Sequence, residues 1–413
     1  MKFSGAEWIG DIPKEWSVTN VGSVYEERNE KVSDIDYEPL SVTMQGILPQ
    51  LSSVVKSDDR NNRKLVKKGD FVINSRSDRR GALGVSDRDG SCSLINTVMT
   101  ARKGIDPRFY NYVFQTPLFP DEYYKYGYGI VDDLWTTRWA QMKKILLPNP
   151  KEGERIKIVK LLDDYCNKID AVIVSTKESI EEYRKLKHSI ISHAIINGID
   201  ENEEKEEISV DWIGRIPLEW CVKTLGQLCI PVKNKNVGTQ ERNLLSLSYG
   251  NIVRKDINST DGLIPENYEG YNIIENGDIV LRLTDLQNDH KSLRVGYVGE
   301  RGIITSAYLT IRNLSSIPSK YIYYYLHSYD VAKGFYGMGS GIRQGLNWGE
   351  LKTLKIALPS DPDEQKRIVN YLDEKCEYID SLLINKEKFL KDMQLYKKTL
   401  IYMYVTGKRR VVQ

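Results

Sequence analysis

The strongest constraint on the fold of this chain is an internal repeat. Residues 7–16 read EWIGDIPKEW and residues 211–220 read DWIGRIPLEW, so seven of ten positions are identical at an offset of 204. Further along each half, a Gly-Asp pair recurs at Asp70 and Asp278. Self-similarity at a fixed spacing marks duplicated structural units. The sequence therefore predicts two copies of one unit.

The spacing of apolar residues changes to a period of seven after Pro150, and the same pattern returns after residue 360. In each segment two apolar rows lie three positions apart, as the a and d rows of a coiled coil do. In each segment a polar residue interrupts one of the two rows at the same register, Thr176 in the first helix and Lys386 in the second. The predicted seam consists of Val159, Leu162, Cys166, Ile169, Ile173, Ile180, Tyr183 and Ile190 in the first helix, and Val369, Leu372, Cys376, Ile379, Leu383, Leu390, Met393 and Leu400 in the second.

Each helix would run for about 45 residues and span roughly 65–70 Å at 1.5 Å per residue. A helix this long with one narrow apolar stripe needs a partner, and its own duplicate is present on the same chain. We therefore expect the two helices to pair antiparallel. The alternative is that each helix folds back on its own globular domain, which heptads alone do not distinguish.

Together these features predict an α+β fold, with two pseudo-twofold-related globular domains joined by two long antiparallel coiled-coil helices. The predicted organisation is a globular domain over 1–150, a helix over 151–198, an acidic linker over 199–208, a second globular domain over 209–360, a second helix over 361–407 and a C-terminal tail over 408–413.

Composition limits where such a chain works. The 413 residues carry 59 basic and 57 acidic side chains, so any basic surface must be local. The five cysteines include no C-x-x-C pair, which argues against a disulfide scaffold or a zinc knuckle. There is no signal-peptide segment and no run of 18 apolar residues. We therefore expect a cytoplasmic protein that does not bind a membrane.

A search for catalytic motifs finds none. Nucleophile elbows, phosphate-binding Gly loops, methyltransferase Asp/Asn-Pro-Pro-Tyr motifs and a convincing nuclease motif are absent. Of the four histidines, His188 and His193 are five residues apart, whereas two ligands on one helix face need a spacing of four. We expect a non-catalytic binding protein with no metal site.

Each half carries two segments with base-reading chemistry, because arginine can bond guanine bidentately and Asn or Gln can bond adenine. Arg and Lys also neutralise phosphates without reading sequence. The candidates in the first half are Asn74, Arg76, Arg79, Arg80, Tyr128, Thr136, Thr137 and Arg138. Those in the second half are Arg282, Thr284, Lys291, Arg294, Arg343, Gln344 and Asn347. The two halves differ in these segments while agreeing in their scaffolding.

In combination, the duplicated Trp-Ile-Gly-x-Ile-Pro-x-x-Trp opening, the LNWGELK segment at 346–352 and EQKRIV at 364–369 resemble the specificity subunit of type I restriction–modification enzymes. The similarity covers essentially the whole chain. The first half departs from the pattern, with GERI at 153–156 in place of EQKR and WTTRW at 135–139 in place of GLNW.

The resemblance implies a non-catalytic subunit that binds double-stranded DNA. Each globular domain would be a target-recognition domain for one half of an asymmetric bipartite site. The paired helices would set the gap and dock two modification subunits, which bring S-adenosylmethionine and adenine methylation. Two restriction subunits would add ATP- and Mg²⁺-dependent translocation and cleavage. This chain would bind no cofactor. Two alternatives are a coiled-coil adaptor that binds protein, and a single-chain nuclease–methyltransferase, against which the missing motifs argue.

Overall fold

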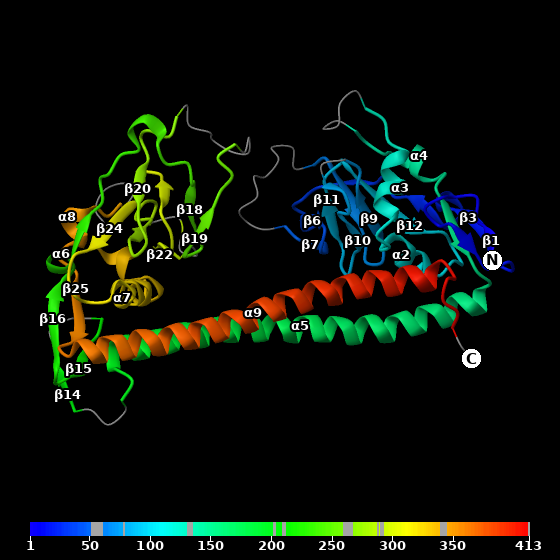
Figure 1. The fold of residues 1–413 in the computed structure, drawn as a ribbon. Coiled ribbons are helices and arrows are strands. Elements are labelled where there is room, and N and C mark those ends of the chain that lie inside the picture. Colours follow the sequence, from blue (N-terminus) through cyan, green and yellow to red (C-terminus); the bar gives the residue numbers. More distant parts are fainter. Residues whose placement is uncertain are drawn as a thin grey trace. The chain divides into compact units, whose positions relative to one another are not determined.

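The computed structural model describes residues 1–50, 61–76, 79–129, 135–200, 204–208, 212–258, 267–286, 289, 293–338 and 345–411. The chain forms two compact units, one of Met1–Lys177 with Glu387–Gln413 and the other of Glu178–Lys386 (Figure 1). Each unit combines one globular domain with a part of both long helices. The domains are the mixed helix-and-strand bodies that the sequence predicts.

The long helices are α5 (Glu152–Asn197) and α9 (Pro362–Val405). In the first unit the start of α5 pairs with the end of α9, and the Lys397 ammonium lies 2.6 Å from the Asp170 carboxylate. In the second unit the end of α5 pairs with the start of α9, where Lys187 lies 2.7 Å from Asp380. The same two residue types meet at an offset of 210, so the predicted antiparallel coiled coil is confirmed within each unit.

The predicted seam residues of both helices are buried or half-buried. The start of α5 also packs on its own domain, because Leu162 and Cys166 share one core with Phe109, Phe114 and Leu400. Helix α5 therefore packs both against the other long helix and against its own globular domain, which the sequence analysis treated as alternatives. At the polar positions of the seam, the Thr176 hydroxyl donates to the carbonyl of Val172 at 2.7 Å. The Lys386 ammonium lies 5.3 Å from the centre of the Tyr183 ring. No helix in the described ranges is long and apolar enough to cross a membrane.

The first globular domain is built on an antiparallel sheet of order β10-β9-β12-β4. The same domain has a three-stranded sheet of order β11-β8-β5 and three two-stranded pairs, β6-β7, β1-β2 and β13-β3. The strands are β1 (Lys2–Phe3), β2 (Asp11–Ile12), β3 (Ser17–Asn20), β4 (Tyr25–Glu27), β5 (Lys31–Val32), β6 (Leu40–Thr43), β7 (Gly46–Pro49), β8 (Arg63–Val66), β9 (Phe71–Asn74), β10 (Leu83–Val85), β11 (Gly90–Cys92), β12 (Asn96–Ala101) and β13 (Leu146–Asn149). The short helices are α1 (Val21–Val24), α2 (Arg108–Phe114), α3 (Phe119–Lys125) and α4 (Trp139–Met142).

The second globular domain repeats this plan, with the strand order β22-β21-β24-β17. Its strands are β14 (Lys205–Glu207), β15 (Arg215–Pro217), β16 (Trp220–Thr224), β17 (Cys229–Pro231), β18 (Leu245–Ser248), β19 (Asn251–Arg254), β20 (Asn272–Ile274), β21 (Ile279–Leu281), β22 (Val295–Tyr297), β23 (Gly302–Ile304), β24 (Leu309–Asn313) and β25 (Lys355–Pro359). The helices are α6 (Leu225–Leu228), η3 (Val237–Thr239), α7 (Ser319–Val331), η4 (Gly334–Gly337) and α8 (Trp348–Leu351).

The acidic stretch at 199–208 is not only a linker. Its residues Lys205–Glu207 form β14, which pairs with β15, as β1 pairs with β2 in the first domain. The registers match at the offset of the repeat, because Lys2 faces Ile12 and Glu206 faces Ile216. The second copy therefore starts inside the predicted linker. Its residues form a paired strand although the stretch is acidic.

The repeated motifs attach each domain to a long helix and hold the turn before the central strand of its sheet. The indole N–H groups of Trp16 and Trp220 each donate at 2.9 Å to a glutamate at the start of a long helix, Glu154 and Glu364 respectively. The repeated aspartate, Asp70 in the first copy, is buried and accepts the Lys67 N–H at 2.8 Å. These motifs are scaffolding, which explains why they persist in both copies.

Candidate nucleic-acid interface

In the first unit the two predicted DNA-reading segments lie side by side. Tyr128 and Thr136 exchange backbone hydrogen bonds of 3.0 Å in both directions. Thr136 also forms an isolated antiparallel β-bridge with Arg76. The Thr137 N–H donates to the Ser75 carbonyl at 3.0 Å. Two segments about sixty residues apart in the sequence therefore form one surface at the end of β9.

Four arginines of this surface are exposed: Arg76, Arg79, Arg80 and Arg138. The Arg138 guanidinium lies 5.6 Å from the centre of the Tyr128 ring, which is 44% exposed. An arginine stacked on an exposed aromatic ring presents its donors outward in a restrained direction. The chemistry of this surface suits phosphates and guanine edges.

Two predicted contact residues of the first unit are instead internal. Asn74 is buried, and its side-chain oxygen accepts the Arg76 N–H at 2.9 Å. Thr137 is buried as well, and its hydroxyl donates to the Tyr123 carbonyl at 2.9 Å. These residues position the surface and do not reach a duplex.

The second unit brings the equivalent segments together in the same way. The Leu346 N–H donates to the Leu283 carbonyl at 3.0 Å, as Thr137 does to Ser75. Thr284 is exposed, and Arg282 is half-buried with Asp289 3.4 Å away. The predicted residues Lys291, Arg343 and Gln344 lie outside the described residues.

Arg294 requires a correction, because its side chain is fully buried. Its guanidinium donates to the backbone carbonyls of Arg282 at 3.1 Å, Thr284 at 2.8 Å, Asp285 at 3.2 Å and Asp289 at 2.5 Å. Its own N–H donates at 2.5 Å to Asp330, a carboxyl whose pKa burial raises to about 6. Arg294 holds the loop in shape and is not a DNA-contacting residue in this fold.

Asn347 also has a structural role that the sequence interpretation missed. It caps helix α8, with its side-chain oxygen accepting the Glu350 N–H at 3.2 Å. The Glu350 carboxylate in turn accepts the Asn347 N–H at 3.0 Å. This capping box fixes the start of α8 beside the reading segment.

Both units have a hollow at the same position of the duplicated fold. The first has a volume of about 590 Å³ and the second of about 440 Å³. Lys64 in the first copy and Asn272 in the second occupy equivalent positions in the strand register. By alignment of the two copies, Arg138 corresponds to Asn347 and Trp139 to Trp348. The lining of the first includes Asn29, Lys64, Arg76, Asn96, Arg138 and Trp139, and that of the second includes Lys233, Lys235, Asn272, Tyr308, Asn347 and Trp348.

The hollows thus keep one tryptophan and exchange most of the polar groups around it. The cation Lys64, which is paired with Glu27 at 3.2 Å, becomes the amide Asn272. Sequence analysis did not find Lys64, Lys233 or Lys235, because they come from strands and loops far from the predicted segments. Two equivalent concave surfaces with different donors can recognise two different polar ligands.

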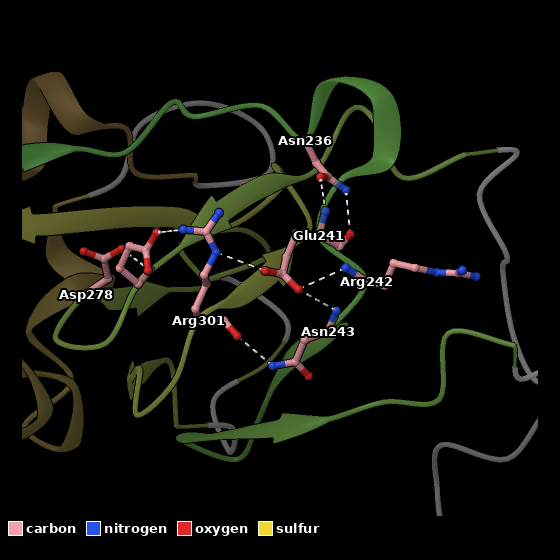
Figure 2. A network of polar contacts seen from close by, with 7 residues as sticks. Asn236, Glu241, Arg242, Asn243, Asp278 and Arg301 are labelled. Carbon is pink, nitrogen blue, oxygen red and sulfur yellow. Dashed lines mark hydrogen bonds and ion pairs between the residues drawn. The ribbon is translucent and has the colours of Figure 1, made fainter.

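A polar network in the second unit supports a further exposed cation, Arg242 (Figure 2). The Glu241 carboxylate accepts the N–H groups of Arg242 at 3.0 Å and Asn243 at 3.1 Å. It also accepts the Arg301 guanidinium at 3.0 Å. The Asn243 N–H bond, together with the Arg301 bond, lowers the pKa of Glu241. The backbone is therefore fixed while the Arg242 side chain points away from the network (Figure 2).

Within the described ranges, no group of three His, Cys, Asp or Glu side chains is placed to hold a metal ion.

Residues 217–388 match the family model of the type I restriction modification DNA specificity domain. The chain carries a type I restriction–modification specificity domain. The match covers the second globular domain and the start of α9, and it includes the LNWGELK segment. The resemblance indicated by the sequence motifs is thereby confirmed.

Solved structures resemble the whole chain, not the specificity domain alone. A chain from a structure concerning complex assembly and conformational transition of the type I R-M system covers 97% of this chain and 100% of its own length, with a TM-score of 0.66 and 14% identity. The HsdS subunit from Thermoanaerobacter tengcongensis covers 97% of this chain and 98% of its own, with a TM-score of 0.46 and 15% identity. The first likeness establishes a shared fold. No curated protein matches.

Proposed function

We propose that this chain is the DNA-recognition subunit of a type I restriction–modification complex, and that each globular domain reads one half of an asymmetric bipartite site. The observation that carries the proposal is the pair of equivalent hollows with different polar linings, in a chain that has a specificity domain. A duplicated scaffold keeps the geometry of docking, and exchanged donors change the bases that are bound.

The remaining parts of the fold have roles in the same complex. The antiparallel helices set the spacing between the half-sites and provide the surface on which two modification subunits dock. Two restriction subunits complete the complex. The chain itself is non-catalytic, and S-adenosylmethionine, ATP and Mg²⁺ are bound by its partners. The exposed arginines supply phosphate contacts, which make affinity fall linearly with salt on a log–log scale.

The test is to co-express the chain with its methyltransferase subunit and to map methylated adenines by long-read sequencing. We expect one bipartite motif with a fixed gap that disappears when this chain is omitted. Methylation that is the same without the chain would contradict the proposal and favour a protein-binding adaptor.

Variants assign each half-site to its domain. Replacing Arg76 and Arg138 by alanine should change the bases accepted in one half-site and leave the other half-site intact. The matched control is Arg108→Ala, because Arg108 is also an exposed arginine of the first domain but does not line the hollow. It lies on α2, and its guanidinium is 2.7 Å from the Asp106 carboxylate. A change in both half-sites would contradict the division of reading between the domains.

A further inference from the structure

Each globular domain carries a hairpin whose tip presents a large apolar side chain to solvent. Hairpin β6-β7 closes with Thr43 opposite Gly46, and β18-β19 closes with Ser248 opposite Asn251. The first residue of each two-residue loop is Met44, 76% exposed, and Tyr249, 74% exposed. Single exposed apolar residues are ordinary on protein surfaces. Their recurrence at one tip position in two diverged copies is not explained by folding.

The backbone at the second tip is arranged at a cost to the fold. Tyr249 has φ +47° and the following Gly250 has φ +82°, so both adopt the left-handed conformation of a type I′ turn. Asn, Asp or Gly relieves this strain, whereas a bulky residue does not. Because three quarters of the Tyr249 side chain is exposed, packing does not offset the strain.

Both hairpins are held against the strand that follows the reading segment. A Cβ atom added to Gly84 in β10 would lie 3.1 Å from the Gly46 Cα. One added to the equivalent Gly296 in β22 would lie 2.6 Å from Leu247. Glycine thus allows the hairpin to approach closely in both copies. In the second copy a Cβ atom added to Gly250 at the tip would lie 3.0 Å from Leu293, so this tip approaches the residue next to Arg294.

Cations flank the hairpin in the second unit. The exposed Arg242 precedes β18, and Arg254 at the end of β19 is exposed and pairs with Glu300. These cations lie at the base of the hairpin, where Leu245 faces Arg254, and the tip projects beyond them. This order suits a duplex, because the cations can bind phosphates while the tip reaches the bases. DNA-binding proteins commonly insert Met, Phe or Leu wedges between base steps.

We propose that Met44 and Tyr249 are apolar wedges, each of which enters the duplex in its own half-site and unstacks a base step. This inference rests on the proposed function. It assigns the hairpin tips a role in deforming the DNA, separate from the binding of its polar groups in the hollows. Specificity would then depend also on how easily the sequence at that step unstacks.

The experiment uses the complex of the full chain with its modification subunits, and a duplex carrying the site mapped by methylation. A 2-aminopurine probe is placed at successive positions of each half-site. We expect its fluorescence to rise at one step per half-site. In Tyr249→Ala the rise should vanish in one half-site only, and affinity should fall by about 5- to 160-fold, the range for one stacked base. Met44→Ala should have the corresponding effect on the other half-site.

Three further variants separate insertion from folding. Tyr249→Phe should behave as the wild type, because a ring suffices for stacking. Tyr249→Asn should be at least as thermally stable as the wild type, since Asn accepts the left-handed backbone, yet bind as weakly as Tyr249→Ala. Leu314→Ala removes an equally exposed apolar side chain (65%) beyond β24, and should leave affinity and fluorescence unchanged.

Wild-type affinity in Tyr249→Ala and Met44→Ala would overturn the wedge proposal while the proposed function stands. Weakened binding with unchanged fluorescence would assign the tips a surface contact and would also overturn insertion. If the wild-type complex produces no site-specific methylation, the proposed function fails, and the wedge fails with it.

Discussion

Replacing Arg294 by methionine tests how the reading segment of the second domain is held. Methionine keeps most of the apolar length of the side chain but removes all of its donors. In the wild type these donors bond four backbone carbonyls, those of Arg282, Thr284, Asp285 and Asp289, at 2.5–3.2 Å. The variant removes the charged donors from all four carbonyls, although the Asp289 carbonyl keeps the Tyr336 hydroxyl at 3.0 Å and the Asp285 carbonyl keeps the Asp289 N–H at 3.3 Å.

The magnitude follows from the number and burial of these bonds. A hydrogen bond to a charged group contributes about 1.5–3 kcal/mol. The four contributions do not add, because the loop can open and return its carbonyls to water. Removing one member of a buried charged network costs about 3–5 kcal/mol, and we expect a loss of unfolding free energy in that range for Arg294→Met.

The loss should depend on pH through Asp330. Burial raises its pKa to about 6, so the folded state holds a proton that the unfolded state releases near pH 4. Stability from this group is therefore present at low pH and falls as pH rises toward 6. Without the Arg294 guanidinium, which favours the charged carboxylate, the fall becomes larger. Arg294→Met should be more destabilising at pH 8 than at pH 5.

The assay is urea denaturation at both pH values, combined with hydrogen exchange of residues 282–286. The control is Arg254→Met, because Arg254 is an exposed arginine of the same domain. We expect no change in its denaturation midpoint. A variant Arg294→Met with wild-type stability and wild-type protection of residues 282–286 would refute the reasoning that this arginine holds the segment.

Three further outcomes are expected. Burial lowers the pKa of His327 to about 3, so on acidification the unfolded state binds a proton before the folded state does. The free energy of unfolding should therefore fall below pH 6.5, by up to about 1.4 kcal/mol per pH unit. His327→Gln should flatten this slope when stability is measured as a function of pH. Gly407→Ala should destabilise the chain by more than about 1–2 kcal/mol in urea melts, because its backbone has φ +70° and the new Cβ would lie 2.4 Å from Pro13, whereas Gly104→Ala, with φ +84° and open space, should show the backbone strain alone. Inserting one heptad in both α5 and α9 should change the gap between methylated half-sites while the half-sites stay the same; altered half-sites with an unchanged gap would contradict the spacing role of the helices.

Local pattern was enough to predict much of this fold. The period of seven located α5 and α9 to within two residues at all four ends, because a heptad stripe follows directly from helix geometry. The duplicated opening motif identified the two copies, and its tryptophans prove to fasten each domain to its helix. The antiparallel pairing also followed, since the partner of each helix was on the same chain.

Local pattern did not assign the polar residues. Arg76 lies just after the buried strand β9 and Arg294 just before the strand β22, both in predicted DNA-reading segments, yet Arg76 is exposed and Arg294 is fully buried. What separates them is the approach of carbonyl groups from a loop folded around Arg294, which is a property of the whole domain. Burial of a charge depends on partners brought from elsewhere in the chain.

The sequence by itself determined the repeat, the two long helices and the class of chemistry, because each is encoded in residues that are neighbours along the chain or at a fixed period. Only the tertiary structure decided which side chains share a hollow and which tips are exposed. Lys64 and Arg138 line one hollow because the strand register and the pairing of the segments at the end of β9 bring them together. No spacing in the sequence records that register, since it is set by long-range packing of the sheet.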